Sequence, residues 1–143
     1  MSLDAATLAL VAGELKNTLL DAKIDKIFEP TRDELVITLR TRTETDSLLL
    51  SARSGSARVC LTEESFENPE TPPSFCMLMR KHLTGGKLLD VRMEPGDRIV
   101  YFEFQCTNEM GDLVRNILCA ELMGRYSNLV LVQNGKIIDA LKR

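Results

Sequence analysis

Residues 99–122 read IVYFEFQCTNEMGDLVRNILCAEL, and this stretch decides the fold class. Apolar side chains alternate with more polar ones at positions 100, 102, 104 and 106, and again at positions 118, 120 and 122. Alternation with a period of two is typical of strands that bury one face. The polar segment around Met110, Gly111 and Asp112 separates the two runs, so the stretch is predicted to form an antiparallel hairpin.

The segments on either side continue this pattern. Leu89, Val91 and Met93 form an alternating stripe before the turn at residues 94–97. Residues 129–132 (LVLV) are continuously apolar, which predicts a strand covered on both faces. The Asn134-Gly135 pair that follows is typical of a type I′ hairpin turn. The C-terminal half is therefore predicted to be antiparallel sheet.

The N-terminal half adds further strands and two helices. Helical spacing of apolar residues predicts a helix from Leu3 to about Leu20, capped by Ser2 or Asp4. Strands are predicted at 22–28, 35–42, 47–52 and 57–61, joined by short connections. The polar segment 62–73 is predicted to be a surface loop, and Thr71 to cap a second helix that ends at residues 85–86. About eight strands and two helices indicate an α+β domain of sandwich-like or barrel-like antiparallel sheets with two flanking helices.

Composition limits the class of protein. The chain has 143 residues, 44% hydrophobic and 27% charged, which is ordinary for one globular domain. No apolar run approaches the ~18 residues of a membrane helix, and no secretory leader is recognisable, so a cytoplasmic location is expected. At a net charge of -3, contact with nucleic acid must come from a local patch. Four cysteines without a CxxC pair and one histidine predict neither a metal site nor a cofactor.

Three candidate sites remain, because no dinucleotide-binding, Walker or serine-hydrolase motif is present. The first is Asp97 with Arg98, where a guanidinium follows a turn in register with an apolar strand face; its alternative is a turn-capping acid and a locally paired arginine. The second is a charged and amide cluster between two strands, whose alternative is a tight turn; it comprises Glu121, Arg125 and Asn128. The third is Asp4, whose alternative is a helix cap.

The chain also resembles a known family. The segments that carry the resemblance are Asp4 ahead of the first helix, 26–30 (KIFEP), 49–52 (LLSA), 67–69 (ENP), 72–83 (PPSFCMLMRKHL), 85–86 (GG), 97–99 (DRI) and 121–131 (ELMGRYSNLVL). Together they resemble the NFACT-N domain of the RqcH/NEMF ribosome quality control family, long described as fibronectin-binding protein A-like. The resemblance extends over residues 1–143 and implies that they form one domain at the N-terminal end of a longer multidomain protein.

This resemblance implies a fold related to the N-terminal domain of MutM-type DNA glycosylases. It implies that the full-length protein binds obstructed large ribosomal subunits and recruits alanyl-tRNA, so that an alanine tail is added to the stalled nascent chain. The N-terminal domain would engage the tRNA, through an Asp-Arg pair that matches Asp97 and Arg98 and an acid that matches Asp4. Ribosomal RNA would transfer the peptide, so the domain is not expected to be an enzyme.

Two other functions are compatible with the resemblance. A glycosylase-like activity would need the N-terminal proline amine of MutM-type enzymes, and position 2 is Ser2. An adhesion module that binds fibronectin is the second alternative, and no motif of this sequence provides a basis for it.

Overall fold

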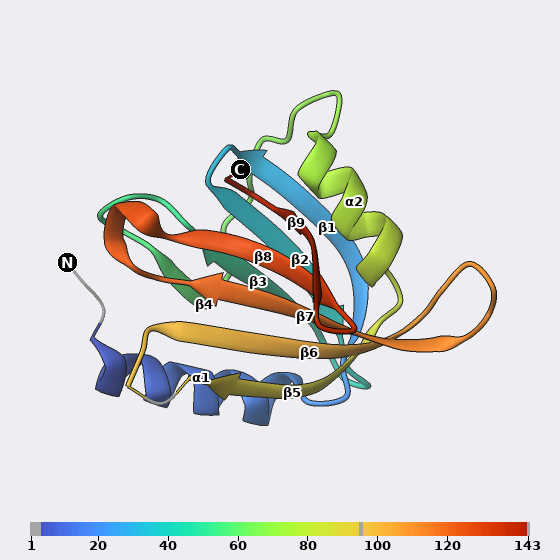
Figure 1. Ribbon diagram of the computed structural model, residues 1–143, viewed down its shortest axis with the longest axis horizontal. Coiled ribbons are helices and arrows are strands. Elements are labelled where there is room, and N and C mark those ends of the chain that lie inside the picture. The colour runs from blue at the N-terminus through green and yellow to red at the C-terminus, as the bar shows by residue number, and fades with distance from the viewer. Residues whose placement is uncertain (1–3, 95, 143) are drawn as a thin grey trace.

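The computed structural model describes residues 4–94 and 96–142, and Figure 1 shows how they are arranged. The proposed cap Ser2 and the turn residue Pro95 lie outside the described residues. The helices are α1 (Ala5–Leu19) and α2 (Ser74–Leu83), with a short 3-10 helix η1 (Gly124–Tyr126). The strands are β1 (Lys23–Thr31), β2 (Glu34–Arg40), β3 (Thr45–Ser51), β4 (Arg58–Thr62), β5 (Lys87–Met93), β6 (Ile99–Thr107), β7 (Leu113–Glu121), β8 (Asn128–Gln133) and β9 (Lys136–Ala140).

The described strands form one antiparallel sheet in the order β4-β3-β2-β1-β5-β6-β7-β8-β9. The α+β antiparallel class with two helices is confirmed, with nine strands among the described residues where about eight were expected, and the strands form one sheet instead of a sandwich of two. Two meanders, β1–β4 and β5–β9, meet where Lys23 of β1 is paired with Lys87 of β5. After α2 the chain returns beside the start of β1, where the Ile24 amide donates to the Gly86 carbonyl at 2.8 Å.

The core lies against one face of this sheet. The predicted stripe of β6 is buried, with Phe102 and Phe104 fully inaccessible to solvent. Both helices contribute to the same core; their buried residues are Leu8, Ala12, Leu15 and Leu19 of α1 and Phe75, Cys76, Met79 and Leu83 of α2. In Figure 1, α1 runs along β5, α2 packs beside β1, and the β6–β7 hairpin extends beyond the rest of the sheet.

Two predicted burial patterns are wrong. In β5 the buried residues are Leu88 and Val91, not an alternating stripe through Leu89, because a register shift between Leu88 and Asp90 changes which side chains face inward. In β8 the structure buries Leu129 and Leu131 but leaves the valines of the other face partly exposed. The Asn134-Gly135 turn is confirmed, since both residues have positive φ, 52° and 77°.

The helix starts differ from each other. Asp4 caps α1, accepting a hydrogen bond from the Thr7 amide at 2.7 Å, whereas α2 is preceded by Pro73 and has no side-chain cap, so the prediction of Thr71 is wrong. A buried acid that was not among the candidate site residues, Glu29 of β1, lies near this uncapped start. Burial raises the pKa of Glu29 to about 7, although the Cys76 amide partly offsets the effect.

Residues 4–94 and 96–142 include no helix long and apolar enough to span a membrane. They bring no three metal-ligating side chains together. Cys76 and Cys106 are buried, and burial raises the pKa of the partly buried Cys119 to about 11. Thiols in this state are poor nucleophiles, so these cysteines act as packing residues.

Candidate nucleic-acid interface

The turn between β5 and β6 contains the first candidate pair, Asp97 and Arg98, and hydrogen bonds fix the conformation of this turn. The Glu94 amide donates to the Ile99 carbonyl at 3.0 Å, and the Asp97 amide donates to the Glu94 carbonyl at 3.2 Å. The Tyr101 hydroxyl donates to the Glu94 carboxylate at 2.9 Å, which raises the pKa of that phenol. Asp97 is therefore presented to solvent on a turn whose stem is held by three hydrogen bonds.

Arg98 occupies the position that the alternation predicts. Its carbonyl accepts a hydrogen bond from the amide of buried Leu122 at 2.9 Å, so the β6–β7 ladder continues one residue beyond β6. Parity with Val100 places Arg98 at the end of the inner face, where the residue is half-buried. A guanidinium is tolerated in this position because it lies at the rim of the core, not within it.

The sheet register brings the second candidate group to the same end. Glu121, the last residue of β7, is directly opposite both Ile99 of β6 and Asn128 of β8. The link between β7 and β8 contains η1, with Arg125 and Tyr126 exposed. Two sites that are separate in the sequence thus form one end of the sheet.

Within this group, Asn128 fixes the position of the C-terminal segment. Its amide nitrogen donates to the Lys142 carbonyl at 2.8 Å, and its amide oxygen accepts from the Lys142 amide at 2.8 Å. Lys142 in turn donates from Nζ to the Ala52 carbonyl at 2.6 Å, which ties the C-terminal segment to the β3–β4 loop. Asn128 is therefore a positioning residue.

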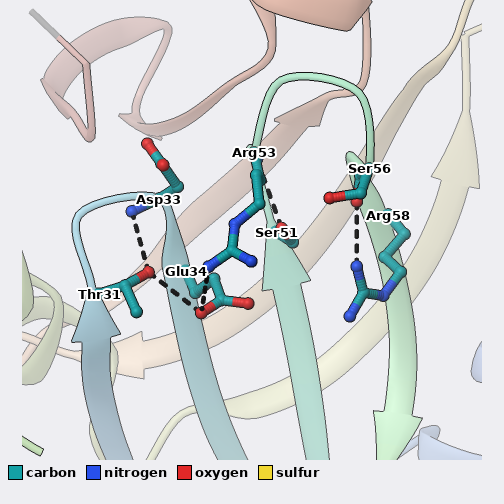
Figure 2. A network of polar contacts seen from close by, with 7 residues as sticks. All are labelled: Thr31, Asp33, Glu34, Ser51, Arg53, Ser56 and Arg58. Atoms are coloured by element: carbon teal, nitrogen blue, oxygen red, sulfur yellow. Dashed lines mark hydrogen bonds and ion pairs between the residues drawn. The ribbon is translucent and has the colours of Figure 1, made fainter.

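The neighbouring loop is itself braced, as Figure 2 shows. Glu34, almost fully buried, accepts from the Thr31 hydroxyl at 3.0 Å and lies 3.5 Å from the Arg53 guanidinium. The Ser51 hydroxyl accepts from the Arg53 amide at 3.3 Å. These contacts hold the β1–β2 turn against the β3–β4 loop to which Lys142 is attached.

Asp4 belongs to the same end of the molecule by topology. α1 runs antiparallel to β5, since Lys16 pairs with Asp90 at 2.9 Å and the Asp21 amide donates to the Leu88 carbonyl at 2.9 Å. From Lys16 the helix start lies ~18 Å away at 1.5 Å per residue, in the direction in which β5 runs toward Glu94. The hydrogen bond from Thr7 lowers the pKa of Asp4, which is fully exposed.

Sequence reasoning missed one residue at this end, Tyr126. The residue is 71% exposed, and the Arg125 guanidinium carbon lies 5.1 Å from the centroid of its ring. An exposed aromatic ring with an arginine against it is typical of surfaces on which unpaired bases stack. The signal was the single aromatic residue within the short link formed by residues 122–127.

The charges of this end favour selective contact over general attraction to RNA. This end of the sheet carries four acids, Asp4, Glu94, Asp97 and Glu121, and two arginines, Arg98 and Arg125. Affinity for a polyanion requires an excess of cations. Arg98 and the Arg125–Tyr126 pair are therefore suited to recognise features of a nucleic acid that other contacts hold in place.

Comparison with known proteins decides the family. The model of the NFACT N-terminal and middle domains matches residues 4–143. The chain belongs to this family. It is 38% identical to the Rqc2 homolog RqcH of Streptococcus suis and 37% identical to that of Bacillus subtilis, over 99% of this chain in each case. It spans about a quarter of the length of these relatives, 26% and 25%.

Two solved structures have the same fold as this chain. The N-terminal domain of the fibronectin-binding protein PavA from Streptococcus pneumoniae matches with a TM-score of 0.91 and 36% identity, over 94% of this chain and 52% of that one. The fibrinogen-binding protein from Staphylococcus aureus matches with a TM-score of 0.85 and 30% identity, over 94% of this chain and 49% of that one. The relation to MutM-type glycosylases that the sequence resemblance implies stays a prediction.

Proposed function

We propose that this chain is the tRNA-engaging domain of a ribosome quality control factor that acts in the cytoplasm. In this proposal the full-length protein binds an obstructed large ribosomal subunit and recruits alanyl-tRNA, and alanine is added to the stalled nascent chain. The observation that carries the proposal is the grouping of Asp97 and Arg98 with Arg125 and Tyr126 at one end of the sheet in a member of the NFACT family.

The proposed mechanism is recognition and positioning. Arg98 provides a planar fork of donors suited to a base edge or a phosphate, and Tyr126 provides a surface for stacking. Asp97 accepts hydrogen bonds that a phosphate cannot donate, which favours a base amino group or a ribose hydroxyl. Peptide transfer is left to ribosomal RNA, so these residues bind and orient tRNA and catalyse no step themselves.

Replacing Arg98 should weaken binding of this chain to tRNA. We expect Arg98→Ala to reduce affinity about 10-fold or more at low ionic strength, because a bidentate arginine contact contributes about 1–3 kcal/mol. Arg98→Lys should recover only part of this loss, since lysine keeps the charge but lacks the fork. Fluorescence anisotropy with a labelled tRNA transcript measures the effect. Equal affinities for wild type and Arg98→Ala would remove Arg98 from the site.

Substitution of Asp4 separates its two possible roles. Asn is as good an N-cap as Asp, so Asp4→Asn should leave the melting temperature of the chain nearly unchanged, whereas Asp4→Ala should lower it. If Asp4 also contacts tRNA through its charge, Asp4→Asn should weaken tRNA binding several-fold in the same anisotropy assay. Unchanged binding by a fully stable Asp4→Asn variant would show that Asp4 only caps α1.

The structural neighbours named as fibronectin-binding and fibrinogen-binding proteins favour adhesion as the second candidate function. Binding of this chain to immobilised fibronectin at physiological salt tests it directly. A glycosylase-like activity is tested by borohydride trapping of an imine with a damaged oligonucleotide. We expect neither result if engagement of tRNA is the function of the domain.

A further inference from the structure

Four cations form a row across the outer face of the sheet. The register pairs Arg40 of β2 with Lys23 of β1, Lys23 with Lys87 of β5, Lys87 with Gln105 of β6, and Gln105 with Arg115 of β7. Side chains directly opposite each other on antiparallel strands lie on the same face. We call Arg40, Lys23, Lys87 and Arg115 the cationic row.

The row faces solvent and contains no acid. The chain neighbours Leu39, Ile24 and Leu88 are buried, so the row occupies the opposite face of each strand. The exposed fractions of the Arg40, Lys87 and Arg115 side chains are 64%, 44% and 70%. Because strands lie ~4.8 Å apart, the four steps from Arg40 to Arg115 span ~19 Å.

This arrangement opposes stability. Like charges placed directly opposite each other on neighbouring strands repel, and the row contains two such pairs, Lys23 with Arg40 and Lys23 with Lys87. The repulsion occurs at the narrow junction where the two meanders are joined. Because this repulsion reduces the stability of the sheet, we infer that the cations are present to bind an external partner.

Acids beside the row orient three of its four members. Asp25 lies 3.3 Å from Arg40, Asp21 lies 3.5 Å from Lys87, and Glu103 lies 3.2 Å from Arg115. Such exposed pairs are weak and are readily exchanged for stronger anions. Lys23, at the centre of the row, has no ion pair among those that the described residues form.

The surface next to the row is hollowed. A groove of about 440 Å³ is lined by Lys23, Arg40 and Arg42, with Thr41 and the acids Asp21 and Asp25. It lies at the junction of the two meanders, because Lys23 begins β1 and Arg40 ends β2. The groove adds a third arginine next to the row and gives a bound chain of phosphates a recessed path.

We propose that the cationic row binds the sugar-phosphate backbone of RNA and supplies the affinity that the acidic Asp97–Arg98 end lacks. A linear series of cations fits a polymer of phosphates better than one small anion, because a nucleic-acid strand presents a charge every ~3.4 Å along its axis. The row lies ~20 Å from the Asp97–Arg98 turn along the seven residues of β5. The inference rests on the proposed function and adds a second contact to it.

The test compares two double variants of equal charge change. Lys23→Gln with Lys87→Gln neutralises two members of the row; Arg32→Gln with Lys136→Gln neutralises two exposed cations outside it. Affinity for a tRNA transcript is measured over a series of salt concentrations. The plot of log affinity against log salt has a negative slope, and we expect its magnitude to decrease by about 2 in the row variant. The control variant should keep the wild-type slope.

The outcomes separate this proposal from the proposed function. Equal slopes in the two double variants would overturn the proposal that the row binds RNA. A loss of tRNA affinity in Arg98→Ala would still support the tRNA site in that case. Absence of tRNA binding by the wild type at low salt would overturn both proposals. Binding to anionic phospholipid vesicles in place of tRNA would assign the row to a membrane surface and overturn it as an RNA contact. The row variant should melt close to the wild-type temperature, because relief of the repulsion between like charges offsets the loss of the weak, exposed Lys87–Asp21 pair.

Discussion

Under the proposed function, alanine tails on stalled nascent chains should be lost when Asp97 and Arg98 are both replaced by alanine in the full-length protein. Tailing requires repeated recruitment of charged tRNA, so a loss of tRNA affinity acts at every round of addition. We expect tail formation to fall about 10- to 100-fold, the effect of removing a bidentate contact and its neighbouring acceptor. Gel analysis of a reporter chain stalled on large subunits measures tail length and yield.

The matched control removes one acid and one cation from the opposite end of the sheet. Glu109 lies in the β6–β7 connection and Lys136 begins β9, far from the Glu121–Asn128 pair. Glu109→Ala with Lys136→Ala should tail normally. Normal tails from the Asp97→Ala, Arg98→Ala protein would refute the site assignment. Folding is not in question, because Asp97 is exposed and Arg98 lies at the rim.

The second large effect concerns the core beneath this site. Phe102 is fully buried, with Val91 opposite on β5 and Leu118 opposite on β7. Phe102→Ala removes an aromatic ring from between these strands and leaves a cavity, so we expect the free energy of unfolding to fall by about 3–5 kcal/mol. Urea denaturation followed by circular dichroism measures this change. A domain of this size has a total stability of about 5–15 kcal/mol, so the variant should be close to unfolding.

Leu113→Ala provides the comparison, because Leu113 is 69% exposed in the same sheet. Its removal should change the free energy of unfolding by no more than about 0.5 kcal/mol. Phe102→Leu should lie between the two, since leucine fills part of the cavity. If Phe102→Ala cost as little as Leu113→Ala, the assignment of the inner face would be wrong. The hydrogen-bond ladder between β6 and β7 extends to Arg98, so the position of Arg98 depends on this core. Phe102→Ala should therefore also weaken tRNA binding.

Some features could be predicted because they depend on residues close together in the chain. The alternation at residues 100–106 was enough to assign the buried face of β6, and Asn134-Gly135 was enough to predict its turn. One of the two roles considered for Asp4 was that of a helix cap. The structure confirms this role, because Asp4 accepts a hydrogen bond from the Thr7 amide. The register shift after Leu88 could not be predicted from the sequence, because a bulge depends on how β5 pairs with β6.

By itself, the sequence determined the α+β antiparallel class, the inner stripes of β6 and β7 and the positions of Asp97 and Arg98 next to a strand, since each follows from side-chain period and turn chemistry. Only the tertiary structure joined the Asp97–Arg98 turn to the link that holds Arg125 and Tyr126, because register between distant strands has no local signal. The same is true of the cationic row. Arg40, Lys23, Lys87 and Arg115 are far apart in the chain, and they share a line only because antiparallel pairing places them opposite one another.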